Sequence, residues 1–180
     1  MTSCVHRIEV HYTIDPRLPA RTDRIRSLGF PVDKVHLIDV YTLATSSRDF
    51  TTQELSQIGS QLINPVVQEY TIDTATRAVF DYALEVGFLP GVTDNVGMTA
   101  RQTIEDYFSI KFNEGDAVYT SQLYLVCGKM TPSSVQKLAS NLANPLVNRV
   151  IIRTRQEYGT KGMDPAVPSV CLHELPTAES

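Results

Sequence analysis

Apolar and polar side chains alternate along six stretches of the chain, a pattern typical of β-strands with one buried face. The expected strands are His6–Ile14, Lys34–Thr45, Val66–Ile72, Phe80–Phe88, Asp116–Cys127 and Val147–Arg153. In the first of these, Ile8 and Val10 share one face with His6, whereas Arg7 and Glu9 lie on the other face, so we expect it to be half-buried.

Four segments between the strands carry apolar residues at helical spacing, which predicts four amphipathic helices. The first is expected over about Thr22–Leu28, with Gly29 as its stop signal. Three further starts carry capping signals, which are Thr51 with Glu54, Thr99 with Gln102 before a helix from about Ala100, and Thr131 before Pro132.

The chain contains an internal repeat at a spacing of 80 residues. The spacing aligns a helix cap, an apolar helical stripe, an Asn-Pro stop and the start of a strand. The aligned pairs are Thr51 with Thr131, Leu55 with Val135, Ile58 with Leu138, Leu62 with Leu142, Asn64-Pro65 with Asn144-Pro145, and Val67 with Val147. The sequence therefore predicts two copies of one β-α-β-α-β unit.

Each expected unit is small, and this predicts how the two copies are arranged. We assign residues 1–75 to the first unit, 76–158 to the second, and 159–180 to a tail or linker rich in Gly and Pro. A domain of this size buries only about 60% of its extended-chain surface and has sheet edges that favour pairing. The expected fold is α+β: two tandem two-layer sandwiches packed as a pseudo-dimer with a joint sheet.

Composition excludes several classes of protein. The chain has 180 residues, a net charge of −4, 42% hydrophobic residues and scattered Lys and Arg, so we expect a soluble protein that does not bind nucleic acid. No apolar run approaches the roughly 18 residues of a membrane span. The three cysteines, Cys4, Cys127 and Cys171, form no C-x-x-C pair, which favours a reducing cytoplasm.

The candidate chemistry lies in the loop between the fourth strand and the third helix. Gly91 and Gly97 frame it, but five residues separate them and Met98 stands where a phosphate-binding loop needs Lys. An ordinary capped loop, a partner contact, and an anion held by N–H groups at the Ala100 helix start all stay open. We expect Arg101 to lie beside Asp94. The carboxylates Glu105 and Asp106 are expected on a solvated helix face.

The residues show no nucleophile with a base, no metal-ligand set and no cofactor-binding loop, so no catalytic residue, metal or cofactor is expected. The segment PGVTDNVGMTAR, residues 90–101, resembles the loop-to-helix signature of PurS, the small subunit of phosphoribosylformylglycinamidine (FGAM) synthase. The resemblance extends to IDVYTL (38–43), ELSQIGSQLINPVVQEY (54–70) and QKLASNLANPLVNRV (136–150), and covers about Val5 to Tyr158. A doubled PurS unit is similar to the N-terminal domain of fused FGAM synthases.

This resemblance implies a non-catalytic assembly role in purine biosynthesis. The chain would bridge the large synthetase subunit and the glutaminase subunit, which make FGAM from formylglycinamide ribonucleotide, ATP and glutamine; we also consider self-association. The expected partner contacts are Pro90, Gly91, Thr93, Asp94, Asn95, Gly97, Thr99, Arg101, Asn64 and Asn144.

The first unit has IDPRLPARTDR, residues 14–24, in place of the signature loop, so we expect only the second unit to dock. The resemblance fits a stand-alone doubled subunit or one domain of a longer chain. The alternative function is a regulatory module in which the Gly91–Thr99 loop holds a small effector.

Overall fold

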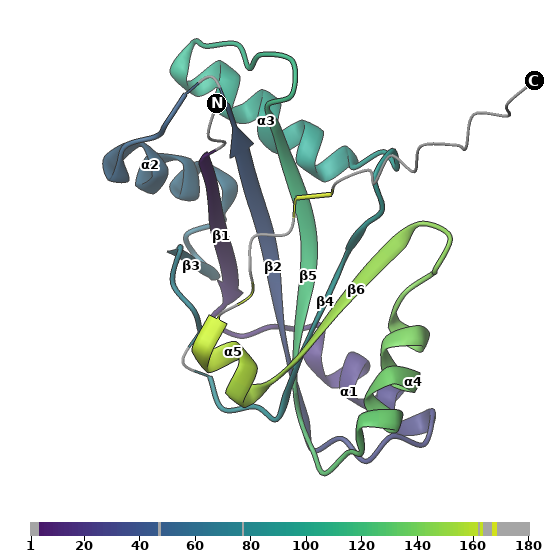
Figure 1. Cartoon of the computed structure of the whole chain (residues 1–180). Coiled ribbons are helices and arrows are strands. Elements are labelled where there is room, and N and C mark those ends of the chain that lie inside the picture. The colour runs from purple at the N-terminus through teal and green to yellow at the C-terminus, as the bar shows by residue number, and fades with distance from the viewer. Residues whose placement is uncertain (1–3, 47, 77, 162, 164–166, 169–180) are drawn as a thin grey trace, which may run out of the picture.

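A computed structural model describes residues 4–46, 48–76, 78–161, 163 and 167–168. In these residues the chain forms one six-stranded antiparallel sheet and five helices (Figure 1). The elements are β1 (Cys4–Tyr12), α1 (Leu18–Ser27), β2 (Lys34–Thr45), α2 (Thr52–Leu62), β3 (Gln68–Ile72), β4 (Tyr82–Phe88), α3 (Asn95–Phe108), β5 (Ala117–Cys127), α4 (Pro132–Leu142), β6 (Asn148–Thr154) and α5 (Arg155–Lys161).

The strand order β3-β1-β2-β5-β4-β6 places the two halves of the chain on the two halves of the sheet. The antiparallel pairing of β2 with β5 joins them, in a register that runs from Lys34 opposite Cys127 to Ala44 opposite Ala117. β1 separates β2 from β3 in one half, as β4 separates β5 from β6 in the other. The expected joint sheet is therefore confirmed.

Four helices pack on one face of the sheet over two separate hydrophobic clusters. One cluster joins α1 and α4 to the sheet through Ile25, Val135 and Leu138. The other joins α2 and α3 to it through Ile58 and Ile104. Both clusters use the same alternate positions of β2, because Val35 and Leu37 belong to the first and Leu43 to the second.

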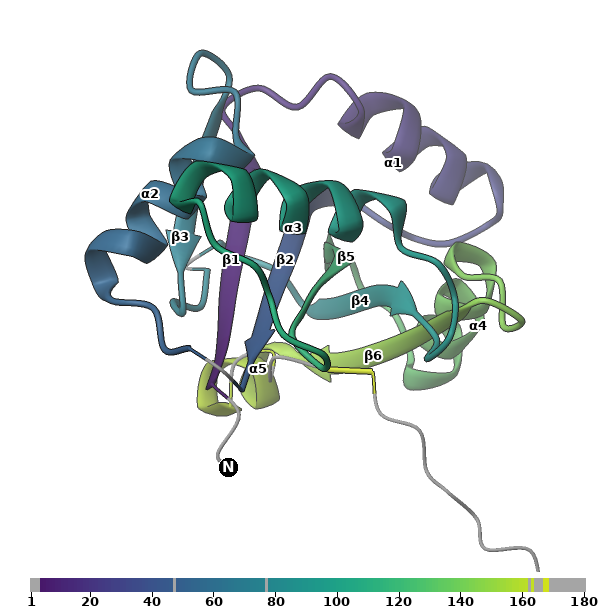
Figure 2. The ribbon, with the colours of Figure 1, turned by 90° about the horizontal axis from the view of Figure 1, so that it is seen from above.

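α5 lies across the opposite face of the sheet (Figures 1 and 2). Its Tyr158 packs edge-on against Phe80, with the ring centroids 5.1 Å apart, over a third cluster that includes Ile38 and Leu123. Phe80 thus lies on the α5 face and outside β4, although the expected strand begins at this residue. The expectation that the first strand is buried on one face only is also wrong, because Arg7 and Glu9 on its other face are buried.

Several element boundaries differ from the sequence-based ones. α1 begins at Leu18, earlier than expected, with Pro19 in its first turn, where Pro needs no N–H partner. β3 begins only at Gln68, since the residues after Asn64 form a turn. The chain is helical up to Lys161, past residue 159 where the tail is expected to begin, and most of the expected tail lies outside the described residues.

A buried ion cluster on the α5 face connects the two halves. The Arg7 guanidinium lies 2.8 Å from Glu9 Oε1 and 3.0 Å from Glu85 Oε2, and Ser121 donates its hydroxyl to Glu85. All three charged side chains are at most 8% exposed. Burial lowers the pKa of Arg7, but Glu85 and Glu9 outweigh burial and raise it, so Arg7 stays charged. One cation from β1 therefore holds a carboxylate on each half of the sheet.

Replacing Arg7 with Met should lower the free energy of unfolding by about 3–5 kcal/mol, because Glu9 and Glu85 would stay buried without their counter-charge. Urea denaturation measures the change. The exposed Lys137→Met is the matched control and should cost under about 0.5 kcal/mol. If the two variants lose equal stability, the cluster does not hold the halves together.

Candidate functional site

The signature segment 90–101 is a tight turn followed by a helix that starts earlier than expected. Pro90 and Gly91 end β4 as expected, and Gly91 has a φ of 82°, which favours Gly. α3 begins at Asn95 with Asp94 as its N-cap, so the expected capping box of Thr99 and a helix start near Ala100 are wrong. The Ala100 N–H lies inside the helix and is therefore not free to hold an anion.

Asp94 joins α3 to β5 through its carboxylate. It accepts a hydrogen bond of 2.8 Å from Gly97 N in the first turn of α3. It also accepts bonds of 2.6 Å from Thr120 N and 2.9 Å from Thr120 Oγ1 on β5. The pairing of β4 with β5 stops at Gly87 and Ser121, so Asp94 takes the place of the next strand residue. Asp94 is a structural residue rather than a free contact group.

Gly97 allows α3 to lie directly against β5. A Cβ atom at this position would lie 2.3 Å from the carbonyl oxygen of Val118, closer than backbone atoms tolerate. The spacing of Asp94 and Gly97 in the signature therefore follows from helix capping and close approach. The alternative effector cradle at Gly91–Thr99 is not formed as expected, because Asn95 to Thr99 are helical.

Arg101 faces away from the loop and fixes the chain between α3 and β5. Its guanidinium donates to the carbonyl oxygens of Phe112 at 3.1 Å and Asp116 at 3.0 Å, and pairs with Glu105 at 3.2 Å. The expected position beside Asp94 is wrong. The expected solvation of Glu105 is wrong as well, since it is 6% exposed and accepts a 2.8 Å bond from Phe112 N.

The two Asn-Pro corners have the same hydrogen-bond geometry. Asn64 Oδ1 accepts from Val66 N at 3.1 Å, and Asn144 Oδ1 accepts from Leu146 N at 3.0 Å. Each corner leaves one large apolar side chain in solvent, Val66 at 85% exposure and Leu146 at 82%. The side-chain oxygens of both Asn residues are thus used within the turns, and the apolar residues form the accessible surface.

The structure brings the predicted contact segments together. Leu89 N donates to Val147 O at 2.9 Å, which holds the Asn144 corner beside the signature loop. The last turn of α2, just before Asn64, lines a groove of about 390 Å³ with Asn95, Val96 and Thr99 of α3. Pro90, Gly91, Thr93, Asn95 and Thr99 are exposed or half-buried, so they remain candidate contact residues.

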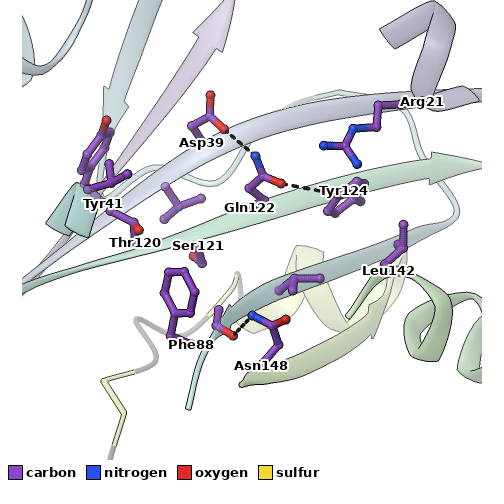
Figure 3. Close-up of a pocket in the computed structure, with 14 residues that line it drawn as sticks. Arg21, Asp39, Tyr41, Phe88, Thr120, Ser121, Gln122, Tyr124, Leu142 and Asn148 are labelled. Carbon is purple, nitrogen blue, oxygen red and sulfur yellow. Dashed lines mark hydrogen bonds between the residues drawn. The ribbon is translucent and has the colours of Figure 1, made fainter. Parts of the chain in front are cut away.

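A larger cavity lies in the middle of the helical face, and we call it the central pocket (Figure 3). It has a volume of about 540 Å³ and is lined by parts of α1, β2, β4, α3, β5, α4 and β6. Asp39 on β2 lies opposite Gln122 on β5, and Gln122 donates to its carboxylate at 3.3 Å. Tyr41 and Val96 line both this pocket and the α2–α3 groove.

Sequence reasoning did not find the central pocket, although a signal exists. Asp39 and Gln122 are polar residues at positions whose alternation places them on the buried, helix-covered face. Such interruptions of an apolar face are expected where a sheet borders a cavity or a charged network. Recognising that they meet requires the β2–β5 register, which no local pattern supplies.

No protein-family model matches the chain, and the search of curated proteins found no match. None of the described helices is both long and apolar enough to cross a membrane. Functional inference therefore rests on the contacts described above and on the sequence resemblance.

Replacing Asp94 with Ala should lower the free energy of unfolding by about 2–4 kcal/mol, since the helix cap is lost and the Thr120 N–H loses its acceptor. The neighbouring Thr93→Ala, at an exposed position, is the control and should change it by under about 0.5 kcal/mol. Urea denaturation compares them. Equal stability of both variants would mean that Asp94 is a surface residue after all.

Protonation of Glu105 should make the free energy of unfolding depend on pH in the acidic range. Hydrogen bonds from Phe112 N and Lys111 lower the pKa of Glu105 from 4.5 to about 2. Because this pKa is lower in the folded state, the stabilisation is present above pH 4.5 and is lost as pH falls toward 2. Glu105→Gln should flatten the decline of unfolding free energy in that interval, whereas the exposed Glu114→Gln should not. An unchanged slope in Glu105→Gln would contradict the assignment.

Proposed function

We propose that the chain is a non-catalytic assembly component of FGAM synthase, acting as a doubled PurS-like module. The resemblance of residues 90–101 to the PurS signature carries this proposal. The fold supports it, because two β-α-β-α-β halves share one sheet in the strand order of a pseudo-dimer. In this role the chain bridges the synthetase and the glutaminase, which supply the chemistry for converting formylglycinamide ribonucleotide, ATP and glutamine to FGAM.

The proposed docking surface comprises the exposed side of the signature segment and the adjoining Asn144 corner. Asp94, Gly97 and Arg101 are used inside the fold, so they shape this surface rather than touch the partner. Val96 and Met98 are 56% and 62% exposed there, and Leu146 is 82% exposed on the corner that the Leu89–Val147 bond holds close. Exposed apolar side chains gathered in one region favour a protein partner.

The halves differ in a way that supports docking by the second unit. Where the second unit caps its helix with Asp94, the first unit forms an ion-pair network. There Arg17 binds Asp15 at 2.8 Å and Asp39 at 2.9 Å, and its guanidinium lies 4.5 Å from the centre of the Tyr12 ring. Burial raises the pKa of Asp15, but the bonds from Arg17 outweigh burial and lower it. The corresponding loop of the first unit is therefore committed to internal contacts.

Met98→Lys should weaken assembly by at least about tenfold, or about 1.4 kcal/mol, because it places a charge in the proposed apolar contact. The assay reconstitutes FGAM formation from the organism's own synthetase and glutaminase and measures the concentration of this chain that gives half-maximal rate. Val79→Lys is the matched control, since Val79 is 67% exposed and lies outside the proposed surface.

The maximal rate at saturating chain should stay unchanged in Met98→Lys, because the residue contributes binding and no chemistry. A half-maximal concentration equal to that of Val79→Lys would exclude the proposed surface. A lack of any effect of the unmodified chain on FGAM formation would contradict the proposed function itself.

A further inference from the structure

We propose that the central pocket is a binding site for a small organic anion with a hydrogen-bonding body, held at its anionic end by Arg21. The inference goes beyond the assembly role and does not depend on it. The pocket volume of about 540 Å³ lies within the range of cavities that hold small metabolites.

Arg21 supplies the charge that selects an anion. Its side chain extends from α1 into the pocket beside Gln122 and Tyr124 (Figure 3). Within the described part of the chain, no hydrogen bond or ion pair engages this guanidinium. The neighbouring Arg17 is by contrast held by Asp15 and Asp39. A guanidinium with free donors in a concave site matches carboxylate and phosphate oxygens in pairs.

The rest of the pocket offers polar groups for the body of the ligand. Burial raises the pKa of Tyr41, with a further contribution from Asp39, so its hydroxyl stays protonated and able to donate. Among the described residues, Asp39 Oδ2 accepts one hydrogen bond, from Arg17 at 2.9 Å, and retains capacity for a ligand hydroxyl. Asn148 and Thr120 line the same cavity on the side of the second unit; their side chains donate to Gly87 O and Asp94, and their oxygens keep acceptor capacity for a ligand.

The pocket is formed by residues from both halves of the chain, so no local sequence motif predicts it. Arg21, Asp39 and Tyr41 come from the first half, and Gln122 and Asn148 from the second. A bound anion would contact groups from both halves, so its binding should stabilise the folded chain by mass action. Phosphate and carboxylate groups both present the paired anionic oxygens that Arg21 can bind. Titration with one probe of each kind distinguishes them.

Isothermal titration calorimetry on the full 180-residue chain uses four probes: ribose 5-phosphate, gluconate, inorganic phosphate and ribose. We expect saturable one-to-one binding of ribose 5-phosphate or gluconate, identifying a phosphate or a carboxylate site respectively. Inorganic phosphate and neutral ribose should bind at least about tenfold more weakly, because each lacks one half of the recognised chemistry.

Arg21→Gln should weaken binding by at least about tenfold, whereas Arg24→Gln, an exposed arginine of the same helix outside the pocket, should change it by less than about twofold. Thermal denaturation confirms that both variants fold. Absence of saturable binding of both organic anions at about 10 mM would overturn the inference. Equal loss of affinity in the two variants would also overturn it, because it would indicate general attraction to the basic side of α1.

Discussion

The antiparallel pairing of β2 with β5 is the interaction on which the rest of the structure depends. It turns two small units, each with a free sheet edge, into one sheet whose central strands carry buried residues such as Val35, Leu43 and Leu123. Unpaired strand edges favour association with other chains, and the β2–β5 pairing removes two such edges. The ion pair of Arg7 with Glu85 connects the same two halves on the face of the sheet that α5 covers. Packing on both faces of the sheet thus depends on one register.

That register also explains where the central pocket lies. Each hydrophobic cluster is covered by one helix from each half, α1 with α4 and α2 with α3, and the pocket borders both clusters. The β2 and β5 residues beneath this region are polar, with Asp39 opposite Gln122 and Tyr41 opposite Thr120. Their hydrogen bonds to Arg17 and Asp94 tie the pocket to the two loops that differ most between the halves. Pocket and proposed docking surface therefore adjoin through Val96 without sharing their main chemical groups.

Local patterns predicted the elements well and the long-range contacts poorly. The capping box of Thr51 with Glu54 and the cap of Thr131 are present, because their partners lie within one helical turn. The cap of Asp94 is equally local, since Gly97 lies three residues away, but the sequence offers Thr99 with Gln102 as a competing cap; only the Asp94 contacts with Thr120, 26 residues away, have no local signal. Burial of Glu105 depends likewise on the fold of the following loop. The proposed partner is inferred from the sequence resemblance alone, because exposed apolar residues do not specify which protein they bind.

The most direct test of the account is affinity capture of the tagged chain from the lysate of its own organism, with the eluate identified by mass spectrometry. The account predicts that the FGAM synthetase and a glutaminase elute together with the chain. It also predicts that both disappear from the eluate when excess untagged chain competes. Elution of the chain without either protein, under conditions in which it is folded, would contradict the assembly role.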